Sequence, residues 1–168
     1  FMVDGRTGMT HDDEEIGHIL RNTRKPVIVA VNKIDSPKQH LDVYEFYNLG
    51  LGDPHPVSSI NALGIGDVLD ALYENFPEKS DDEDDDGRIK VAVIGKPNVG
   101  KSSFINRISK RTTAGVGNKP GVTKQKQWIR INEKIELLDT PGVLWPKFES
   151  QEVALNLAFT GTIKEDIL

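Results

Sequence analysis

Short apolar runs alternate with stretches of helical spacing along this chain. The runs 26–31 and 89–94 are nearly continuous and rich in β-branched residues, as expected for parallel strands buried on both faces. Shorter strands are expected to end near Val3 and to cover 55–58. Helices are expected at about 12–22 with Thr10 as N-cap, around 43–49, at 65–76 and at 103–108. The alternation predicts an α/β fold with a mostly parallel, doubly wound sheet.

The second half contains a different pattern as well. Residues 128–131 and 135–138 are short apolar segments that flank a polar tripeptide, which predicts one antiparallel hairpin. A last helix is expected at about 151–159. All of these elements are interpreted as parts of a single domain that spans 1–168.

Charge and composition divide the chain in two. Segment 77–87 has almost no apolar content and holds six consecutive acids, so we expect a solvated linker between 1–76 and 88–168. The net charge is −5, and without those six acids the rest of the chain sums to +1. No apolar run is long enough to span a bilayer, and cysteine is absent. We expect a cytoplasmic, monomeric protein without membrane contact, with native sequence beyond one or both ends.

The strongest chemical motif lies between an expected strand and an expected helix. Residues 95–102 read Gly-Lys-Pro-Asn-Val-Gly-Lys-Ser and match G-x-x-x-x-G-K-[ST] at every fixed position. Glycines let backbone N–H groups surround phosphate oxygens, and the lysine reaches the β and γ phosphates. The alternative is a glycine-rich turn without a ligand. The residues expected to contact nucleotide here are Lys96, Pro97, Asn98, Val99, Gly100, Lys101, Ser102 and Ser103.

Three further residues complete an expected Mg²⁺ and γ-phosphate site. Asp139 opens Asp-Thr-Pro-Gly after an apolar strand, where a carboxylate can hold Mg²⁺ together with the Ser102 hydroxyl. Thr123, in a loop, is expected to join the Mg²⁺ shell, and the Gly142 N–H to contact the γ phosphate. A turn capped by Asp139 is the alternative. Lys101, Thr123 and Gly142 are the residues to which we assign catalytic roles.

The first half holds a motif that reads guanine. Asp35, in Asn32-Lys33-Ile34-Asp35, can accept two hydrogen bonds from the guanine edge, a pair of donors that adenine lacks. Asn32 is expected to tie this loop to the phosphate loop, and the Lys33 stem to cover one face of the base. A helix N-cap is the alternative for Asp35. In Ser58-Ser59-Ile60, a backbone N–H, first of all that of Ser59, is expected to bind guanine O6.

The motifs therefore occur in an unusual order. In common P-loop GTPases the phosphate loop comes first and the base-reading motifs come last, whereas here residues 1–76 read the base and 88–168 hold the phosphate loop and switches. The eleven residues of the acidic segment reach roughly 36 Å at most when fully extended, which is ample to join the two halves. We expect a circularly permuted G domain.

Two family resemblances follow from specific segments. Residues 1 to about 105 resemble the Der (EngA) family of bacterial GTPases at 2–10, 31–35, 44–52, 63–67 and the phosphate loop. Residues from about 106 resemble the permuted ribosome-assembly GTPases of the RbgA (YlqF) family at 119–123, 127–129, 136–149 and 158–164. The resemblance implies large-ribosomal-subunit assembly, with the subunit or its rRNA as a partner through flanking regions. The junction suggests a chimera of two parents.

The residue after Gly142 bears on the rate of hydrolysis. Val143 stands where many GTPases have a glutamine that orients water, so we expect slow intrinsic GTP hydrolysis. Asn98 resembles the residue that helps to hold K⁺ in potassium-stimulated relatives; its alternative role is to brace the loop. The sequence thus predicts a GTP- and GDP-binding, Mg²⁺-dependent and K⁺-stimulated GTPase, or alternatively a nucleotide-binding scaffold without significant turnover.

Overall fold

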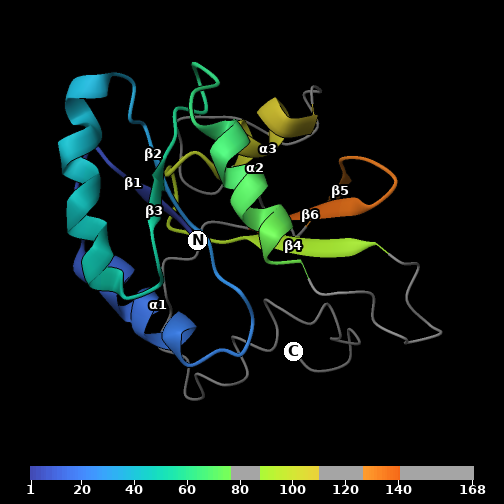
Figure 1. The fold of residues 1–168 in the computed structure, drawn as a ribbon, viewed down its shortest axis with the longest axis horizontal. Coiled ribbons are helices and arrows are strands. Elements are labelled where there is room, and N and C mark those ends of the chain that lie inside the picture. Colours follow the sequence, from blue (N-terminus) through green and yellow to red (C-terminus); the bar gives the residue numbers. More distant parts are fainter. Residues whose placement is uncertain (77–87, 110–126, 141–168) are drawn as a thin grey trace.

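The computed structural model describes residues 1–76, 88–109 and 127–140. Two three-stranded sheets form the framework (Figure 1). The first half contains β1 (Met2–Asp4), α1 (His11–Arg21), β2 (Val29–Asn32), the 3₁₀ helix η1 (Pro37–Leu49), β3 (Pro54–Pro56) and α2 (Ile65–Glu74). The second half contains β4 (Ile89–Val93), α3 (Lys101–Ser109), β5 (Gln127–Arg130) and β6 (Ile135–Asp139).

One sheet was predicted, but within the described residues the strands form two sheets of three strands each. The first sheet has the order β1-β2-β3 and is wholly parallel. In the second sheet, of order β4-β6-β5, β4 and β6 are parallel and only β5 and β6 form an antiparallel pair. A mostly parallel arrangement with one antiparallel hairpin is therefore confirmed for this part of the chain.

The two sheets meet where β1 passes the end of β4. The Met2 N–H donates to the Ile94 carbonyl oxygen at 2.8 Å. The contact is so close that a Cβ on Gly95 would lie 2.2 Å from the Met2 carbonyl oxygen. Figure 1 accordingly shows the N-terminus in the middle of the molecule, between the strands of the first sheet and those of the second.

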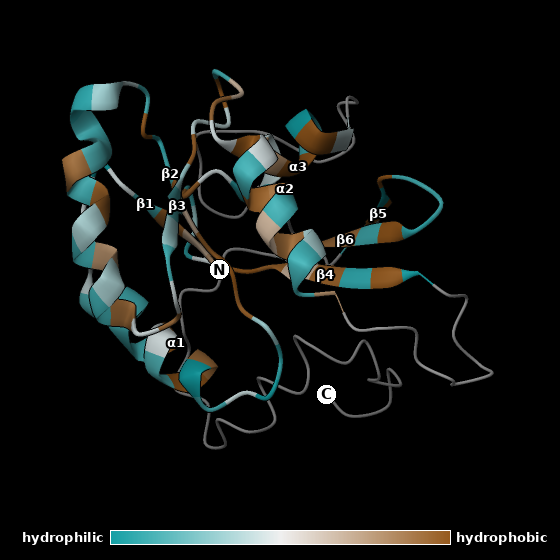
Figure 2. Ribbon diagram, in the orientation of Figure 1, coloured by the Kyte–Doolittle hydropathy of each residue, from teal (hydrophilic) through white to brown (hydrophobic). Residues whose placement is uncertain are grey.

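Helices cover both faces of the first sheet. Val3 and Val31 pack with residues of α1 and η1, including the fully buried Phe46. Met2, the neighbour of Val3 in sequence, packs on the opposite face with α2 and α3, for example against Phe104. Successive strand side chains point to opposite faces, so this sheet is doubly wound. Figure 2 shows the apolar residues of the strands and the inner helix faces gathered between these layers.

Two helices illustrate what local sequence determines. Thr10 is the N-cap of α1, as predicted: its hydroxyl accepts from the Asp13 N–H, and the Asp13 carboxylate accepts from the Thr10 N–H at 3.0 Å. The segment around 43–49 was expected to be an ordinary helix, but it is 3₁₀. Its buried residues Val43, Phe46 and Leu49 recur every three positions, which matches three residues per turn.

Several predictions fall outside the described residues and stay predictions. They are the acidic linker at 77–87, the loop with Thr123, Gly142 with Val143, and the helix at 151–159. Within the described part of the chain, no helix has both the length and the apolar character needed to cross a bilayer.

Candidate nucleotide site

The phosphate loop connects β4 to α3, as its motif requires. Lys101 is the first residue of α3, so the loop ends at a helix N-terminus, where backbone N–H groups favour an anion. Asn98 adopts a left-handed backbone with φ 63° and is exposed, whereas Val99 is buried against the core. Pro97 and Ser103 are half-buried.

Lys101 folds back onto its own loop. Its ammonium donates to the carbonyl oxygens of Gly95 at 2.7 Å and Lys96 at 2.9 Å. Burial lowers the pKa of the Lys101 ammonium to about 8, and the nearby Asp139 carboxylate partly opposes this shift. The side chain is thus positioned inside the loop, with its charge partly desolvated and available to an anion.

The predicted Mg²⁺ ligands of the described chain lie together. Ser102 Oγ donates to Asp139 Oδ2 at 3.0 Å, across the gap between α3 and the end of β6. Asp139 is buried, and the adjacent Thr140 hydroxyl donates to the Val93 carbonyl oxygen at 2.8 Å, which fixes the chain beyond the strand. A hydroxyl and a carboxylate are hard oxygen donors of the kind Mg²⁺ prefers, so this pair fits that ion.

Asn32 joins three loops. Its Nδ2 donates to the Val99 carbonyl oxygen of the phosphate loop at 2.7 Å. Its Oδ1 accepts from the Ser59 N–H at 3.0 Å and from the Ser59 hydroxyl at 2.9 Å. The structure therefore brings the base-reading segments of the first half against the phosphate loop of the second.

The bond to Asn32 involves a group with a predicted role in base recognition. The Ser59 N–H, expected to bind guanine O6, donates to the Asn32 amide oxygen in the structure, and its contact with O6 stays a prediction. Ile60, the other residue proposed for this segment, is 70% exposed at the same turn.

Asp35 is held by several donors. Its Oδ1 accepts from the Ser58 hydroxyl at 2.5 Å and from Asn61 Nδ2 at 3.3 Å, while Oδ2 forms an ion pair with Arg6. The Ser58 hydrogen bond, and after it the Arg6 guanidinium, lower the pKa of the Asp35 carboxyl although partial burial opposes them. Asp35 is therefore an ionised acceptor at neutral pH.

Lys33 contributes through an ion pair. Its backbone is left-handed, with φ 69°, and its ammonium pairs with the Asp4 carboxylate at the end of β1. This contact fixes the end of the side chain. The role of its stem against a base stays a prediction.

Two interactions at the site were missed at the level of sequence. Lys96 Nζ lies 3.1 Å from Asp13 Oδ2 and donates to the Thr10 hydroxyl at 2.5 Å, joining the phosphate loop to α1. Arg107 of α3 donates to the Ser59 carbonyl oxygen at 3.1 Å and to that of Ile60. The partners are 47 or more residues apart in sequence, so no local spacing of residues predicts these contacts.

These features define a class. A phosphate loop between a parallel strand and a helix, a Ser102–Asp139 pair for Mg²⁺ and an Asp35 loop tied to it by Asn32 are the parts of a P-loop GTPase G domain.

Comparison with known proteins agrees with this class. Residues 90–168 match the family described as 50S ribosome-binding GTPase. Proteins named GTPase Der are similar over 146 residues: the protein of Clostridium novyi is 47% identical, with 85% of this chain and 33% of the relative covered. The Chloroflexus aggregans protein is 48% identical with 85% and 32% covered, and that of Halalkalibacterium halodurans 43% with 85% and 33%. The chain spans about a third of the length of these relatives.

The extent of this similarity bears on the suggested junction. The matches to GTPase Der cover 146 residues, more than the first 105 or so in which that resemblance was noticed. They give no support to a chimera with the RbgA family. The relatives named above are GTPases by name, and the family matched by residues 90–168 is one of GTPases.

Proposed function

We propose that this chain binds GDP and GTP with Mg²⁺ and hydrolyses GTP. The observation that carries the proposal is the 2.7 Å bond from Asn32 to Val99, because it joins a base-reading motif to a phosphate loop. ATPases also have a phosphate loop, so this loop alone does not identify the base. The ionised Asp35 carboxylate, whose loop is joined to the phosphate loop by Asn32, selects a base with two neighbouring hydrogen-bond donors.

Three residues of the phosphate and Mg²⁺ site have separate roles in this proposal. Lys101 releases the Gly95 and Lys96 carbonyl oxygens and neutralises charge on the β and γ phosphates. Ser102 and Asp139 hold the Mg²⁺, which would supply positive charge next to the transferring phosphoryl group. Thr123 and Gly142, outside the described residues, are proposed as the third magnesium ligand and the γ-phosphate contact.

We also propose that the motif order is that of one circularly permuted G domain. Contacts between the halves support it: Met2 bonds to Ile94, Lys96 pairs with Asp13, and Arg107 bonds to Ser59. These pairs lie in the strands, the phosphate loop and the helix that surround the nucleotide motifs.

We propose that the protein is a monomer. Size-exclusion chromatography with light scattering tests this oligomeric state.

Slow, K⁺-stimulated turnover is the finer part of the proposal. Val143 offers no hydrogen bond to water, and the exposed Asn98 side chain could give an amide oxygen to K⁺ beside the phosphates. Turnover measured in KCl and in NaCl tests the role of the ion. Equal GTP turnover rates of the wild type in the two salts would show that K⁺ has no part in the mechanism. The turnover rate of the Asn98→Ala variant should then also be the same in KCl and in NaCl.

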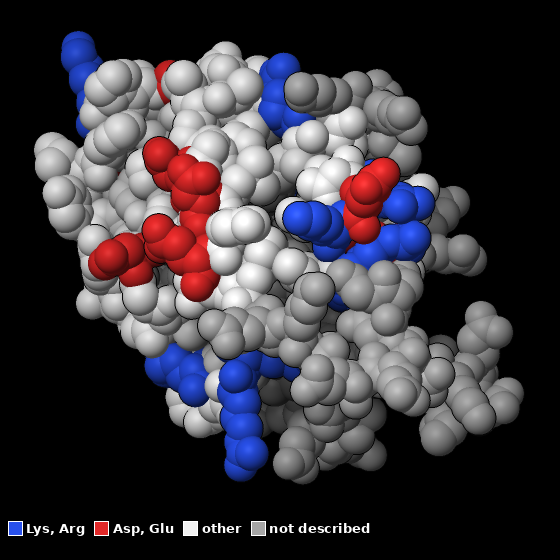
Figure 3. Space-filling view, turned by 45° about the vertical axis from the view of Figure 1, so that its right-hand side comes forward, with Lys and Arg blue, Asp and Glu red and all other residues white. Residues whose placement is uncertain are grey.

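The large ribosomal subunit is the proposed partner, supported by the match of residues 90–168 to a family of 50S ribosome-binding GTPases. In the view of Figure 3, one cluster of acidic side chains lies beside a cluster of mixed sign, and no continuous basic stripe crosses the described part of this face. We propose that the contact with the subunit or its rRNA is made through regions flanking this chain.

Nucleotide titration tests the central proposal. GDP and GTP should bind far more tightly than ATP, Asp35→Ala should abolish this preference, and chelation of Mg²⁺ should weaken GTP binding. Ser102→Ala should lose most of the Mg²⁺ effect, whereas Ser109→Ala, at the far end of α3, should keep it. Tight GDP binding without any GTP turnover would instead favour the scaffold, an alternative that the similarity to GTPases does not favour.

A further inference from the structure

The Asp35 carboxylate carries three donors in the structure. Two of them, the Ser58 hydroxyl at 2.5 Å and Asn61 Nδ2 at 3.3 Å, share Oδ1. The third, the Arg6 guanidinium, binds Oδ2, to which no other side chain of the described residues donates. The two oxygens are thus unequally occupied.

The number of donors on each Asp35 oxygen determines which of them must leave when guanine binds. An ionised carboxylate accepts at about four positions, two on each oxygen. A guanine edge brings two donors, one for each oxygen, so Oδ2 can accept one while keeping Arg6. Oδ1 is already full and must release a donor. Asn61 is the one to leave, since its bond is long and its side chain exposed, whereas Ser58 is fully buried.

We propose that Arg6 is a positioning residue for guanine recognition, which holds Asp35 Oδ2 while Ser58 holds Oδ1, and that the Asn61 amide is displaced by the base. The inference rests on the proposed function, because it takes Asp35 as the group that reads guanine. With both oxygens fixed, the carboxylate plane is set before binding, and one acceptor position on each oxygen faces the base.

Arg6 is itself fixed by the neighbouring motif. Its backbone N–H donates to Asp4 Oδ1 at 3.0 Å, and the other oxygen of Asp4 pairs with Lys33. The Thr7 hydroxyl donates to the Asp4 carbonyl oxygen at 3.2 Å, which closes the turn after β1. The turn after β1 therefore holds the Arg6 guanidinium next to Asp35, and the ion pair of Asp4 with Lys33 ties this turn to the base-reading segment.

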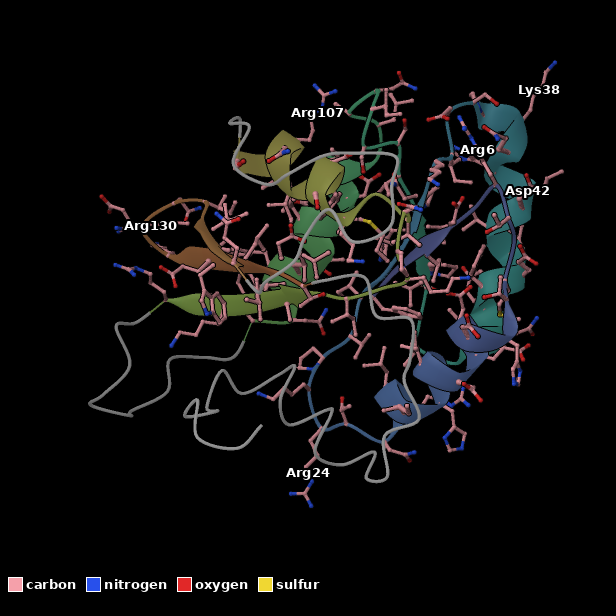
Figure 4. All side chains as sticks on the ribbon, turned by 180° about the vertical axis from the view of Figure 1, so that it is seen from behind. Arg6, Arg24, Lys38, Asp42, Arg107 and Arg130 are labelled. Atoms are coloured by element: carbon pink, nitrogen blue, oxygen red, sulfur yellow. The ribbon has the colours of Figure 1, made fainter. Side chains whose placement is uncertain are left out.

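Figure 4 places Arg6 at the end of the molecule where Arg107 also lies, and Arg24 at the opposite end. Arg24 is exposed and makes no hydrogen bond or ion pair within the described residues. It is a matched control of the same charge and chemistry.

The experiment compares affinities for GDP and inosine diphosphate, which lacks the exocyclic amino group, in wild type, R6A, R6K, N61A and R24A. We expect R6A to weaken GDP binding about tenfold, which is the order of one charge-assisted hydrogen bond. Binding of inosine diphosphate should weaken less. The ratio of GDP affinity to inosine diphosphate affinity should therefore fall. R6K should restore part of the ratio, because an ammonium can still reach one carboxylate oxygen. N61A should bind GDP as tightly as wild type or a few-fold tighter, and R24A should match wild type.

Three results would overturn the inference: an unchanged ratio in R6A, tighter GDP binding in R6A, or GDP binding weakened by N61A as much as by R6A. The first would show that Arg6 does not position Asp35, the second that it competes with the base, and the third that Asn61 is a ligand. If circular dichroism shows that R6A is unfolded, the ratio of GDP affinity to inosine diphosphate affinity in R6K takes its place as the test. Failure of the proposed function itself is distinct, since wild type and R24A would then show no preference for GDP over ATP.

Discussion

The side chain of Asn32 donates to the backbone carbonyl of Val99 at 2.7 Å, although 67 residues separate them in sequence. The same amide accepts two hydrogen bonds from Ser59. All of these groups are buried. One side chain therefore satisfies polar groups of the phosphate loop and of the base-reading loop together, so the alignment of the two loops depends on it.

Asn32→Ala should destabilise the protein and weaken GDP binding together. It leaves the Val99 carbonyl and the Ser59 N–H unpaired in the interior, at a cost of about 1–3 kcal/mol for each group. Urea unfolding measures the first effect and nucleotide titration the second. Asn48→Ala, at an exposed position of η1, should stay within about 0.5 kcal/mol of wild type. Equal behaviour of the two variants would contradict the bridging role.

The sequence predicted the elements better than the contacts between them. Local patterns located the strands, the Thr10 cap and the phosphate loop, because each is encoded within a few residues. Burial on both faces holds for β2 but was wrong for β4, in which only Val93 is buried. Arg107 and its carbonyl partners were not foreseen, because their approach depends on how α3 packs on a distant loop. The hydrogen bond from the Ser59 N–H was not foreseen for a related reason, because its acceptor oxygen belongs to a side chain 27 residues earlier.

Protonation of Asp35 should produce a specific pH dependence. Its pKa is lowered from 3.8 in the folded state by the Ser58 hydrogen bond and by Arg6. Between the folded and unfolded pKa values the unfolded chain binds more protons, so stability rises with pH there. The stabilisation is complete above the unfolded value and is lost as the pH falls through the folded one.

Asp35→Asn removes this contribution. Its urea midpoint should lie below that of wild type at pH 7, and the gap should narrow as the pH is lowered to about 3. Asp42→Asn, an exposed position of η1 labelled in Figure 4, is the control and should show no gap that closes with pH. A gap of constant size in Asp35→Asn would mean that the carboxylate makes no ionic contribution.

Lys96 and Asp13 should behave as a coupled pair. Asp13 is fully buried, its Oδ2 forms an ion pair with Lys96, and its Oδ1 has no hydrogen-bond partner within the described residues. Lys96→Met leaves a buried carboxylate without its cation and should cost about 3–5 kcal/mol. The double variant with Asp13→Asn should cost less than the sum of the two single changes, measured by urea unfolding without nucleotide. Strict additivity would show that the pair is uncoupled, and Lys25→Met, at an exposed site, should be near neutral.

Gly100 should be irreplaceable for a reason that Gly66 does not share. Gly100 has φ +96°, and a Cβ there would lie 2.2 Å from Asn32 Nδ2, so an alanine must distort the backbone and push away the bridging amide. Gly100→Ala should lower the free energy of unfolding by about 1–3 kcal/mol from strain alone and should weaken GDP binding further through Asn32. A Cβ on Gly66, in α2, would meet nothing within 4 Å, so Gly66→Ala should raise helix stability by up to about 1 kcal/mol with unchanged GDP affinity. Thermal unfolding and GDP titration of both variants check this contrast, and a Gly100→Ala protein with wild-type affinity would show that the Asn32 bridge is not required for nucleotide binding.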